Sequence, residues 1–406
     1  MLLQFKLENF MSFKDEAKIS MIATNIHEHE ESLIEIGGNK VLPVATIFGA
    51  NASGKSNVFR AFLAMMGEVV LRFDKNETHK LIRPYAFCNH ANEKATEFEV
   101  CIQIEGKEYR YGFARDEKYV YEEWLYEKKF SKRAMKEKCV FYRECAGTKK
   151  NTLHSEANKQ EKKEIEFISS MTNNDELILQ NLGKRAISKY ACVYQWFCTT
   201  AKVADFSDDY DEFVNREHAA KYIYKEKALQ KAVLNILHKI DEAIQDIKVE
   251  KEKDYELNDI YEVYFLHECE KSDAIWLSLN QESSGTKKMF SLAVRMLESL
   301  IAGKVLFMDE LDAKLHPLVL RYILRMYSDK ELNVGQGQLI FSSHNLICLD
   351  SSDLRRDEIW FVEKKNQESS LYSLYDFKEE EGSIRSDLSF GKHYLSGRFG
   401  AIPFQD

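Results

Sequence analysis

Polar and hydrophobic residues alternate over residues 4–8, and this period of two predicts a strand with one buried face. Residues 41–48 form a short apolar, β-branched run that ends at a glycine, as expected of a fully buried strand. The segments 98–104 and 108–114 alternate again around a Glu-Gly-Lys turn and predict a hairpin, with 119–127 as a third strand. The first part of the chain is therefore expected to be rich in antiparallel strands.

Hydrophobic residues return every three or four positions between 228 and 247, which predicts a helix. They are Leu229, Val233, Ile236, Leu237, Ile240, Ala243, Ile244 and Ile247. A stripe that faces the protein core explains this spacing more simply than a face that binds a partner. Spacing alone leaves both interpretations open.

From about residue 255 onward, short apolar runs alternate with amphipathic ones. The expected strands are 260–266, 305–308 and 339–341, and the expected helices are 286–300 and 317–327. Such alternation favours a parallel sheet covered by helices. Two further runs, 359–364 and 371–377, are expected to pair as the last strands of the chain.

These patterns predict an α/β protein in three parts. Residues 1–127 form an N-terminal lobe with an antiparallel β subdomain, 128–254 a basic and mainly helical insertion, and 255–406 a C-terminal lobe. One α/β core, a mixed sheet with helices, that an insertion interrupts is the simplest architecture.

Composition narrows the class of protein. The chain has 406 residues, 44% hydrophobic and 30% charged, which rules out a disordered or disulfide-stapled protein. No run of about 18 apolar residues predicts a transmembrane helix, and early charged residues argue against a signal peptide. The eight cysteines are scattered without a Cys-x-x-Cys pair, so we expect reduced thiols, no metal site built from them, and a cytoplasmic protein.

The charge is unevenly distributed. Fifty-seven Lys and Arg against 66 Asp and Glu give a net charge of −9, which excludes a uniformly basic surface for nucleic acid. Residues 128–163 nevertheless carry twelve basic residues and only four acidic ones. The basic residues are Lys128, Lys129, Lys132, Arg133, Lys136, Lys138, Arg143, Lys149, Lys150, Lys159, Lys162 and Lys163. A solvated surface is the simpler interpretation, and contact with DNA or an acidic partner is the alternative.

Residues 49–56 read Gly-Ala-Asn-Ala-Ser-Gly-Lys-Ser and match the phosphate-binding pattern GxxxxGK[ST] at every specified position. A predicted buried strand precedes this loop and a helical run follows it, so main-chain N–H groups at a helix N-terminus can approach phosphates closely. Lys55 is expected to reach the β- and γ-phosphates, and the Ser56 hydroxyl to bind Mg²⁺. The expected nucleotide-binding residues are Gly49, Asn51, Ala52, Ser53, Gly54, Lys55, Ser56 and Asn57.

The buried run 305–308 ends in two adjacent carboxylates, Asp309 and Glu310. Many strands end at an acidic turn, but a phosphate-binding loop in the same chain favours a catalytic interpretation. Asp309 is then expected to hold Mg²⁺, and Glu310 to polarise the attacking water.

Three further features belong with these motifs. A Ser-Gly turn before a helical run offers N–H donors from Ser284, Gly285 and Thr286, although by itself it could be only a helix cap. Asp312 follows the paired carboxylates. His344 follows the predicted strand 339–341; a lone histidine is more often structural, but beside these motifs it can contact a γ-phosphate.

The order of these motifs resembles the ABC-type ATPase heads of RecF, SMC, Rad50 and OLD proteins. By this resemblance the motifs are Walker A (49–56), the signature (283–287), Walker B (Asp309 and Glu310), the D-loop (Asp312) and the switch histidine (His344). The signature departs from Leu-Ser-Gly-Gly-Gln, and no glutamine is assigned to the Q-loop. The resemblance implies a homodimer or higher oligomer that buries ATP between Walker A of one subunit and the signature of another.

Residues 282–286, 309–317, 356–364 and 394–403 carry a closer resemblance. They look like stand-alone RecF-like ATPases of bacterial phage-defence operons, of the abortive-infection and PARIS AriA-like kind. This implies an ATPase that acts as sensor or scaffold and controls a separate TOPRIM-type nuclease or toxin through ATP-dependent oligomerisation. A phage protein or DNA would be the trigger, and no membrane is involved.

Two expectations complete this interpretation. Only 62 residues follow His344, so no intrinsic nuclease domain is expected. The alternative function is a RecF- or SMC-like DNA-maintenance ATPase that clamps duplex DNA. The predicted insertion of 128–254 is too short for the long coiled coil of SMC proteins, which favours a compact head in either case.

Overall fold

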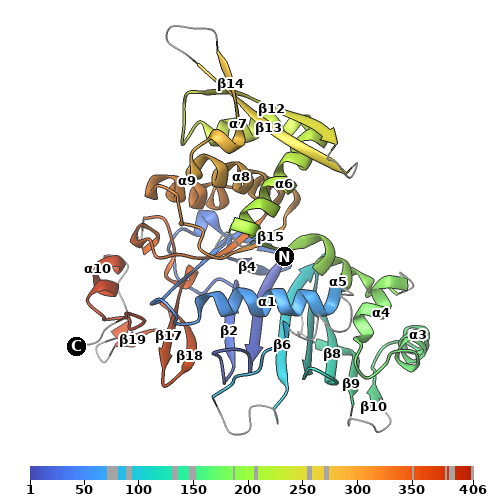
Figure 1. Cartoon of the computed structure of the whole chain (residues 1–406). Coiled ribbons are helices and arrows are strands. Elements are labelled where there is room, and N and C mark those ends of the chain that lie inside the picture. The colour runs from blue at the N-terminus through green and yellow to red at the C-terminus, as the bar shows by residue number, and fades with distance from the viewer. Residues whose placement is uncertain are drawn as a thin grey trace.

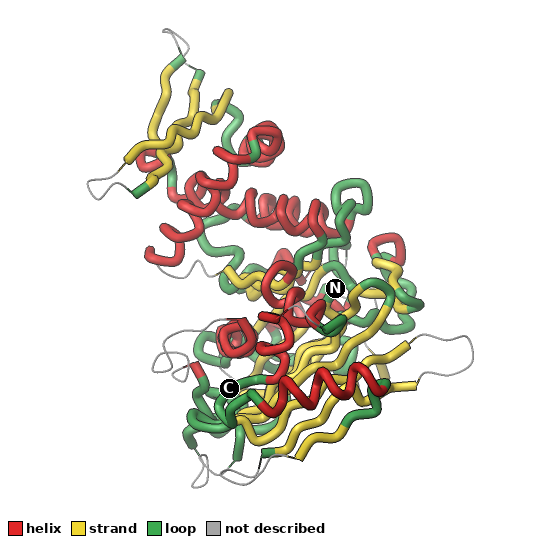
Figure 2. The backbone as a smooth tube through the Cα atoms, turned by 90° about the vertical axis from the view of Figure 1, so that its right-hand side faces the viewer, coloured by secondary structure: helices red, strands yellow, loops and turns green. Residues whose placement is uncertain are grey.

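The chain forms a head of two large sheets around a central helix, and a smaller sheet projects from this head (Figures 1 and 2). The computed structural model describes residues 1–70, 81–87, 94–129, 136–145, 152–185, 188–204, 209–253, 258–268, 274–349, 352–379, 382–383 and 389–403. Helices and mixed strands confirm the predicted α/β class, with a P-loop core and an antiparallel β subdomain.

The first large sheet is antiparallel, with seven strands in the order β10-β9-β8-β7-β6-β1-β2. Its strands are β1 (Leu2–Glu8), β2 (Ala17–Ser20), β6 (Thr96–Ile104), β7 (Lys107–Arg115), β8 (Val120–Lys129), β9 (Lys136–Glu144) and β10 (Thr152–His154). Phe5 and Leu7 are fully buried while Lys6 and Glu8 between and after them are half-buried, so the predicted one-sided strand is confirmed. The predicted hairpin is β6–β7, and its third strand is β8.

The second large sheet carries the chemistry. Its order is β11-β15-β16-β5-β17-β18, and every pair is parallel except the last hairpin, β17–β18. The strands are β5 (Val44–Phe48), β11 (Ala201–Ala204), β15 (Val305–Met308), β16 (Gln338–Ser342), β17 (Ile359–Lys365) and β18 (Glu368–Ser373). The carboxyl ends of the parallel strands therefore meet at one edge, where a ligand site is expected.

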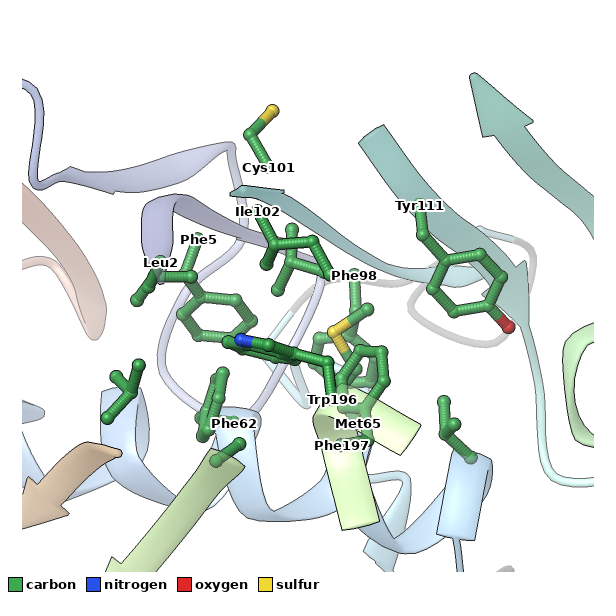
Figure 3. Close-up of a cluster of buried hydrophobic side chains, with 14 of the residues drawn as sticks. Leu2, Phe5, Phe62, Met65, Phe98, Cys101, Ile102, Tyr111, Trp196 and Phe197 are labelled. Carbon is green, nitrogen blue, oxygen red and sulfur yellow. The ribbon is translucent and has the colours of Figure 1, made fainter. Parts of the chain in front are cut away.

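Helix α1 (Lys55–Val70) lies between the two large sheets. Phe62 on this helix stacks on Phe307 of β15, with ring centroids 3.8 Å apart, and meets Phe5 of β1 edge-on at 5.1 Å. Trp196 also packs against Phe62 (Figure 3). Because aromatic contacts hold α1 from both sides, the loop that precedes it has a rigid support.

Helices cover the other face of the second sheet. They include α8 (Ser284–Ala302) and α9 (Pro317–Ser328), which confirm the two predicted helices with ends shifted by one or two residues. The other α-helices among the described residues are α3 (Lys159–Ser170), α4 (Ile178–Arg185), α5 (Ala191–Gln195), α6 (Asp209–Lys225), α7 (Gln230–Leu237) and α10 (Phe390–Leu395). Small two-stranded ribbons pair β3 (Ile34–Ile36) with β4 (Asn39–Val41), and β19 (Lys378–Glu379) with β20 (Gly382–Ser383).

The predicted insertion, 128–254, is not one helical unit. Strands β9 and β10 continue the antiparallel sheet beyond residue 127, because β9 pairs with β8 along its whole length. Strand β11 then adds an edge to the second sheet beside β15. The boundary at 127 therefore falls inside a sheet, and the elements between 128 and 254 are shared among the head sheets and the projecting sheet.

The prediction of a helix over 228–247 was wrong for the second half of this range. Helix α7 ends at Leu237, and β12 (Ile244–Lys253) pairs with β13 (Asp259–His267), which in turn pairs with β14 (Ile275–Ser278). A β-bulge between Ile244 and Asp246 puts both Ile244 and Ile247 on the buried face. Their spacing of three thus arises from a bulged strand and imitates a helical turn.

The described basic residues of 128–163 include several that are paired with acids. Lys128 lies 3.1 Å from Glu108, and Lys138 lies 3.3 Å from Glu161. Arg143 is fully buried and bonds to Glu123, so it belongs to the core of the sheet. Lys132, Arg133, Lys149 and Lys150 lie outside the described residues. The alternative interpretation, contact with DNA or an acidic partner, rests on the remaining lysines.

Candidate nucleotide site

The loop between β5 and α1 is Walker A, and its two outer glycines are required by close contacts. A Cβ atom on Gly49 would lie 2.4 Å from the main-chain oxygen of Val362, on the neighbouring strand β17. Gly54 has φ +113°, and a Cβ there would lie 2.5 Å from the Ser369 hydroxyl. Side chains at either position would push the loop away from the sheet.

The Lys55 side chain is folded back along this loop. Its ammonium group donates to the carbonyl oxygens of Gly49, at 2.8 Å, and Ala50, at 3.1 Å. Lys55 is only 7% exposed, and burial lowers its pKa, although the carboxylates of Asp309 and Glu310 act in the opposite direction. The cation is therefore partly desolvated and held beside the two carboxylates.

Strand β15 delivers Asp309 and Glu310 to the same edge. The hydroxyl of Ser342, at the end of β16, donates to Asp309 Oδ1 and accepts a hydrogen bond of 2.8 Å from the Glu310 N–H. Glu310 has φ +49°, a left-handed conformation that a glutamate adopts only when its surroundings impose it. One serine thus orients both carboxylate residues.

His344 and Asp312 are joined across the same edge. The His344 main-chain N–H donates to Asp312 Oδ2 at 3.0 Å. Burial lowers the pKa of His344, and the nearby Lys55 ammonium lowers it further, while the Asp312 carboxylate raises it in part. The net effect favours a neutral imidazole at neutral pH, with one nitrogen as donor and the other as acceptor.

These motifs surround one cavity of about 370 Å³, which we call the phosphate-side cavity. Its lining residues are Asn51, Ala52, Ser53, Gly54, Lys55, Ser56, Asn57, Arg60, Asp309, Glu310 and His344. The structure therefore brings together Walker A, Walker B and the predicted switch histidine. Gly49 packs against Val362 and Asp312 accepts the His344 main-chain N–H, but neither residue lines the cavity itself.

The signature residues lie apart from this cavity. Ser283 caps α8, since its hydroxyl accepts the Thr286 N–H at 3.1 Å, and Thr286 itself is buried. Ser284 is exposed and Gly285 is half-buried at the first turn of the helix. None of Ser284, Gly285 and Thr286 is among the residues that line the phosphate-side cavity. Within one chain the signature therefore does not line the cavity that Walker A and Walker B form.

Sequence reasoning missed four residues of the site. Arg60 lines the cavity one helical turn after Ser56, so helical spacing alone could have indicated it. Ser342 follows a predicted strand, but its two contacts depend on the order of strands. The hydroxyls of Ser12 and Ser369 both lie against the Cα of Gly54 and bond to each other at 2.8 Å, and Asn57 donates to Ser12 at 2.7 Å. Their separation along the chain hid this cluster.

The residues present fit ATP and Mg²⁺. The Ser53 hydroxyl is buried without a hydrogen-bond partner among the described residues, and it lines the cavity together with the first N–H groups of α1. Lys55 supplies a cation for phosphate oxygens, whereas Ser56 and Asp309 supply the hydroxyl and carboxylate oxygens that Mg²⁺ prefers. Bound Mg²⁺ would neutralise part of the phosphate charge. The side chains of this chain would position the phosphates and the ion.

Several solved structures of SMC head domains are similar to this chain. The SMC head domain from Thermotoga maritima is 15% identical, with 92% of this chain and 98% of that chain covered and a TM-score of 0.42. The Smc head domain from Pyrococcus furiosus, bound to the C-terminal domain of ScpA, is 12% identical over 92% and 96% of the two chains, with a TM-score of 0.46. That from Pyrococcus yayanosii is 11% identical over 98% and 99%, with a TM-score of 0.47. A search of the curated proteins finds no match.

A family profile gives the decisive comparison. Residues 44–350 match the family described as "AAA domain, putative AbiEii toxin, Type IV TA system". The match begins at β5 and ends after His344, so it contains every residue that lines the phosphate-side cavity. It covers well over half of the chain. The chain therefore belongs to this AAA-domain family, and its site is that of a P-loop ATPase.

Proposed function

We propose that the protein hydrolyses ATP with Glu310 as the residue that polarises the attacking water. The observation that carries this proposal is the common cavity that Lys55, Glu310 and His344 line. Glu310 is a candidate base because a carboxylate within reach of the γ-phosphate position can accept a proton from water. Lys55 stabilises negative charge on the phosphates, and a neutral His344 can donate a hydrogen bond to the γ-phosphate.

We further propose that ATP joins two heads. The signature residues Ser284, which is exposed, and Gly285, which is half-buried, do not line the cavity of their own chain, so they are available to cap ATP held by another copy. A head-to-tail pair would then bury two nucleotides in a symmetric interface. Loss of the γ-phosphate removes the bridge between Walker A and the signature, and the pair opens.

Two substitutions test the ATPase and the association together. Glu310→Gln is expected to bind ATP, hydrolyse it at least a hundredfold more slowly and remain associated, because only the proton acceptor is lost. Lys55→Ala is expected to lose ATP binding and to stay a monomer. Analytical ultracentrifugation with and without ATP measures both. The same oligomer for both variants under both conditions would contradict the ATP-dependent switch.

The cellular role proposed for this ATPase is control of a separate effector, a TOPRIM-type nuclease or a toxin, in anti-phage defence. Support comes from the resemblance of residues 282–286, 309–317, 356–364 and 394–403 to defence ATPases, and from the toxin–antitoxin wording of the family description. Co-purification of the protein with the product of the neighbouring gene tests this role. ATPase stimulation by duplex DNA, without such a complex, would instead favour a DNA-maintenance clamp.

A further inference from the structure

A second cavity, of about 640 Å³, lies on the other side of the Walker A loop. One wall is the outer side of the loop, including Asn51 and Ala52. Another is the turn of the β17–β18 hairpin at Asn366 and Gln367, and the third is the end of the chain at 401–403. Its volume is within the range of about 300–1,000 Å³ typical of small-molecule sites. Figure 1 shows β17, β18 and α10 beside one another at this side of the head.

The two cavities share a wall, because Asn51, Ala52 and Ser53 line both. The strand order explains how one ligand can occupy them together. Asp309 and Glu310 follow β15, on one side of the loop strand β5, whereas the second cavity lies over β17, on the opposite side. A nucleotide whose γ-phosphate faces the carboxylates can therefore extend its ribose and base away from them, toward β17.

Several contacts hold residues 399–401 in place, next to the lining residues Ile402 and Pro403. The Tyr394 hydroxyl donates to the Ala401 oxygen at 3.0 Å, and the Tyr372 hydroxyl donates to the Phe399 oxygen at 2.7 Å. Gly400 has no room for a side chain, since a Cβ would lie 2.9 Å from both Glu363 Oε1 and the Tyr372 hydroxyl. These contacts fix 399–401 on the hairpin and so set the position of Ile402 and Pro403.

The chemistry of the lining suits a nucleoside. Asn366 and Gln367 carry amide groups, which offer both a donor and an acceptor to the edge of a base. Ile402 and Pro403 present apolar surface on which a flat ring can lie. Lys364 and Lys365 keep the cavity mouth positive, although Lys365 also pairs with Glu363 at 2.7 Å.

We infer that this second cavity holds the base and ribose of the nucleotide, and that the C-terminal stretch 394–403 serves to build it. The inference rests on the proposed ATPase function and adds to it the residues that recognise the nucleoside. It also gives a role to the stretch 394–403, whose residues carry no catalytic group.

The conformation of the β17–β18 turn allows the amide side chains of Asn366 and Gln367 to be removed while the hairpin keeps its structure. Asn366 and Gln367 have φ of +49° and +69° and form the two-residue loop between the paired Lys365 and Glu368. Glycine favours such left-handed turn positions, so the double substitution Asn366→Gly/Gln367→Gly should keep the turn. Glu105→Gly, at φ +49° in the turn between β6 and β7, is a matched control far along the chain.

The experiment measures binding of ATP and of inorganic tripolyphosphate, each with Mg²⁺, by calorimetry on the full-length chain. Wild type should bind ATP at least tenfold more tightly than tripolyphosphate. The double glycine variant and Ile402→Ala should each bind ATP roughly five- to tenfold more weakly, because one or two hydrogen bonds or an apolar contact are lost. Both variants should bind tripolyphosphate as wild type does, and Glu105→Gly should change neither ligand.

Two results would overturn the inference alone. They are equal wild-type affinity for ATP and tripolyphosphate, or site variants that weaken both ligands equally or neither. If wild type binds neither ligand, the proposed ATPase function fails as well. The two failures are therefore distinguishable.

Discussion

The ammonium group of Lys288 lies 2.9 Å from the main-chain oxygen of Glu310. Lys288 also donates to the Ala313 oxygen at 2.8 Å and is only 1% exposed. It stands on α8, four residues after Ser284, so one side chain bonds the helix of the signature to the backbone of the proposed catalytic carboxylate. A shift of α8 when the signature meets a second head would thereby be transmitted to Glu310.

Replacement of Lys288 by methionine tests this connection. Lys288→Met keeps most of the side-chain volume but leaves two carbonyl oxygens without their charged donor. We expect ATP turnover to fall at least tenfold while the dissociation constant for ATP changes less than about threefold, because the phosphate-side cavity itself is intact. Hydrogen bonds to charged groups contribute about 1.5–3 kcal/mol each, so urea unfolding should show a loss of roughly 2 kcal/mol or more.

Lys40→Met is the matched control for this prediction. Lys40 is an exposed residue of β4 that pairs with Glu30 at 3.1 Å, and it belongs neither to the signature nor to the lining of the phosphate-side cavity. Turnover and stability should stay within about twofold and 0.5 kcal/mol of wild type. A Lys288→Met protein that loses ATP binding in proportion to turnover would refute the proposed transmission.

Ser342 provides a second test, because its hydroxyl contacts both Walker B residues. Ser342→Ala removes the donor to Asp309 and the acceptor of the Glu310 N–H, so both carboxylates lose a restraint. The Mg²⁺ concentration at half-maximal ATPase activity should rise about tenfold, as expected when a group that orients a metal ligand is lost. The buried serine Ser299 donates to the Lys304 oxygen away from the cavity, and Ser299→Ala should leave the Mg²⁺ dependence unchanged. An identical shift in both variants would point to general destabilisation.

Linear motifs explain how much of the site was predictable. Each Walker motif is one continuous stretch of sequence, so its residues in the phosphate-side cavity were predicted from the motif itself. His344 was predicted from its place after a strand, and Arg60 was missed. Contacts such as that of Ser12 with Ser369 join positions 357 apart in sequence, and only the fold brings them together. The bulge at Ile244 produced a spacing of three inside a strand, which a periodicity argument interprets as a helix.

The pair of serines that lies against Gly54, Ser12 and Ser369, gives a third prediction. The Ser369 hydroxyl donates to the Ser53 oxygen, and its main-chain N–H donates to the Ser12 oxygen at 2.7 Å. Ser369→Ala should free the loop and raise the KM for ATP about tenfold, with kcat within about threefold, since the group restrains binding rather than chemistry. Ser369→Thr keeps the hydroxyl and should restore part of the affinity. The adjacent and exposed Ser370, changed to alanine, should behave as wild type in the same steady-state assay.

Glu358 is buried in the turn before β17, and this leads to a prediction about pH. Burial raises the pKa of its carboxyl group from an ordinary value of 4.5 to about 8; the Asp357 carboxylate acts in the same direction, while Arg355 opposes it. One oxygen accepts the Arg355 N–H at 2.9 Å, and the other has no hydrogen-bond partner among the described residues. The folded protein therefore keeps the proton of Glu358 at neutral pH.

The sign of the effect follows from proton binding. Between pH 4.5 and 8 the folded state holds a proton that the unfolded state has released, so the free energy of unfolding must fall as pH rises, by up to about 1.4 kcal/mol per pH unit from this group. Glu358→Gln stays neutral in both states and should remove that slope. In urea unfolding at pH 5.5 and 7.5, the stability of the variant relative to wild type should be greater at the higher pH. The control Glu35→Gln, at an exposed residue of β3, should keep the wild-type slope. Equal slopes for wild type and Glu358→Gln would mean that Glu358 is ionised in the folded protein, and that Arg355 compensates its burial.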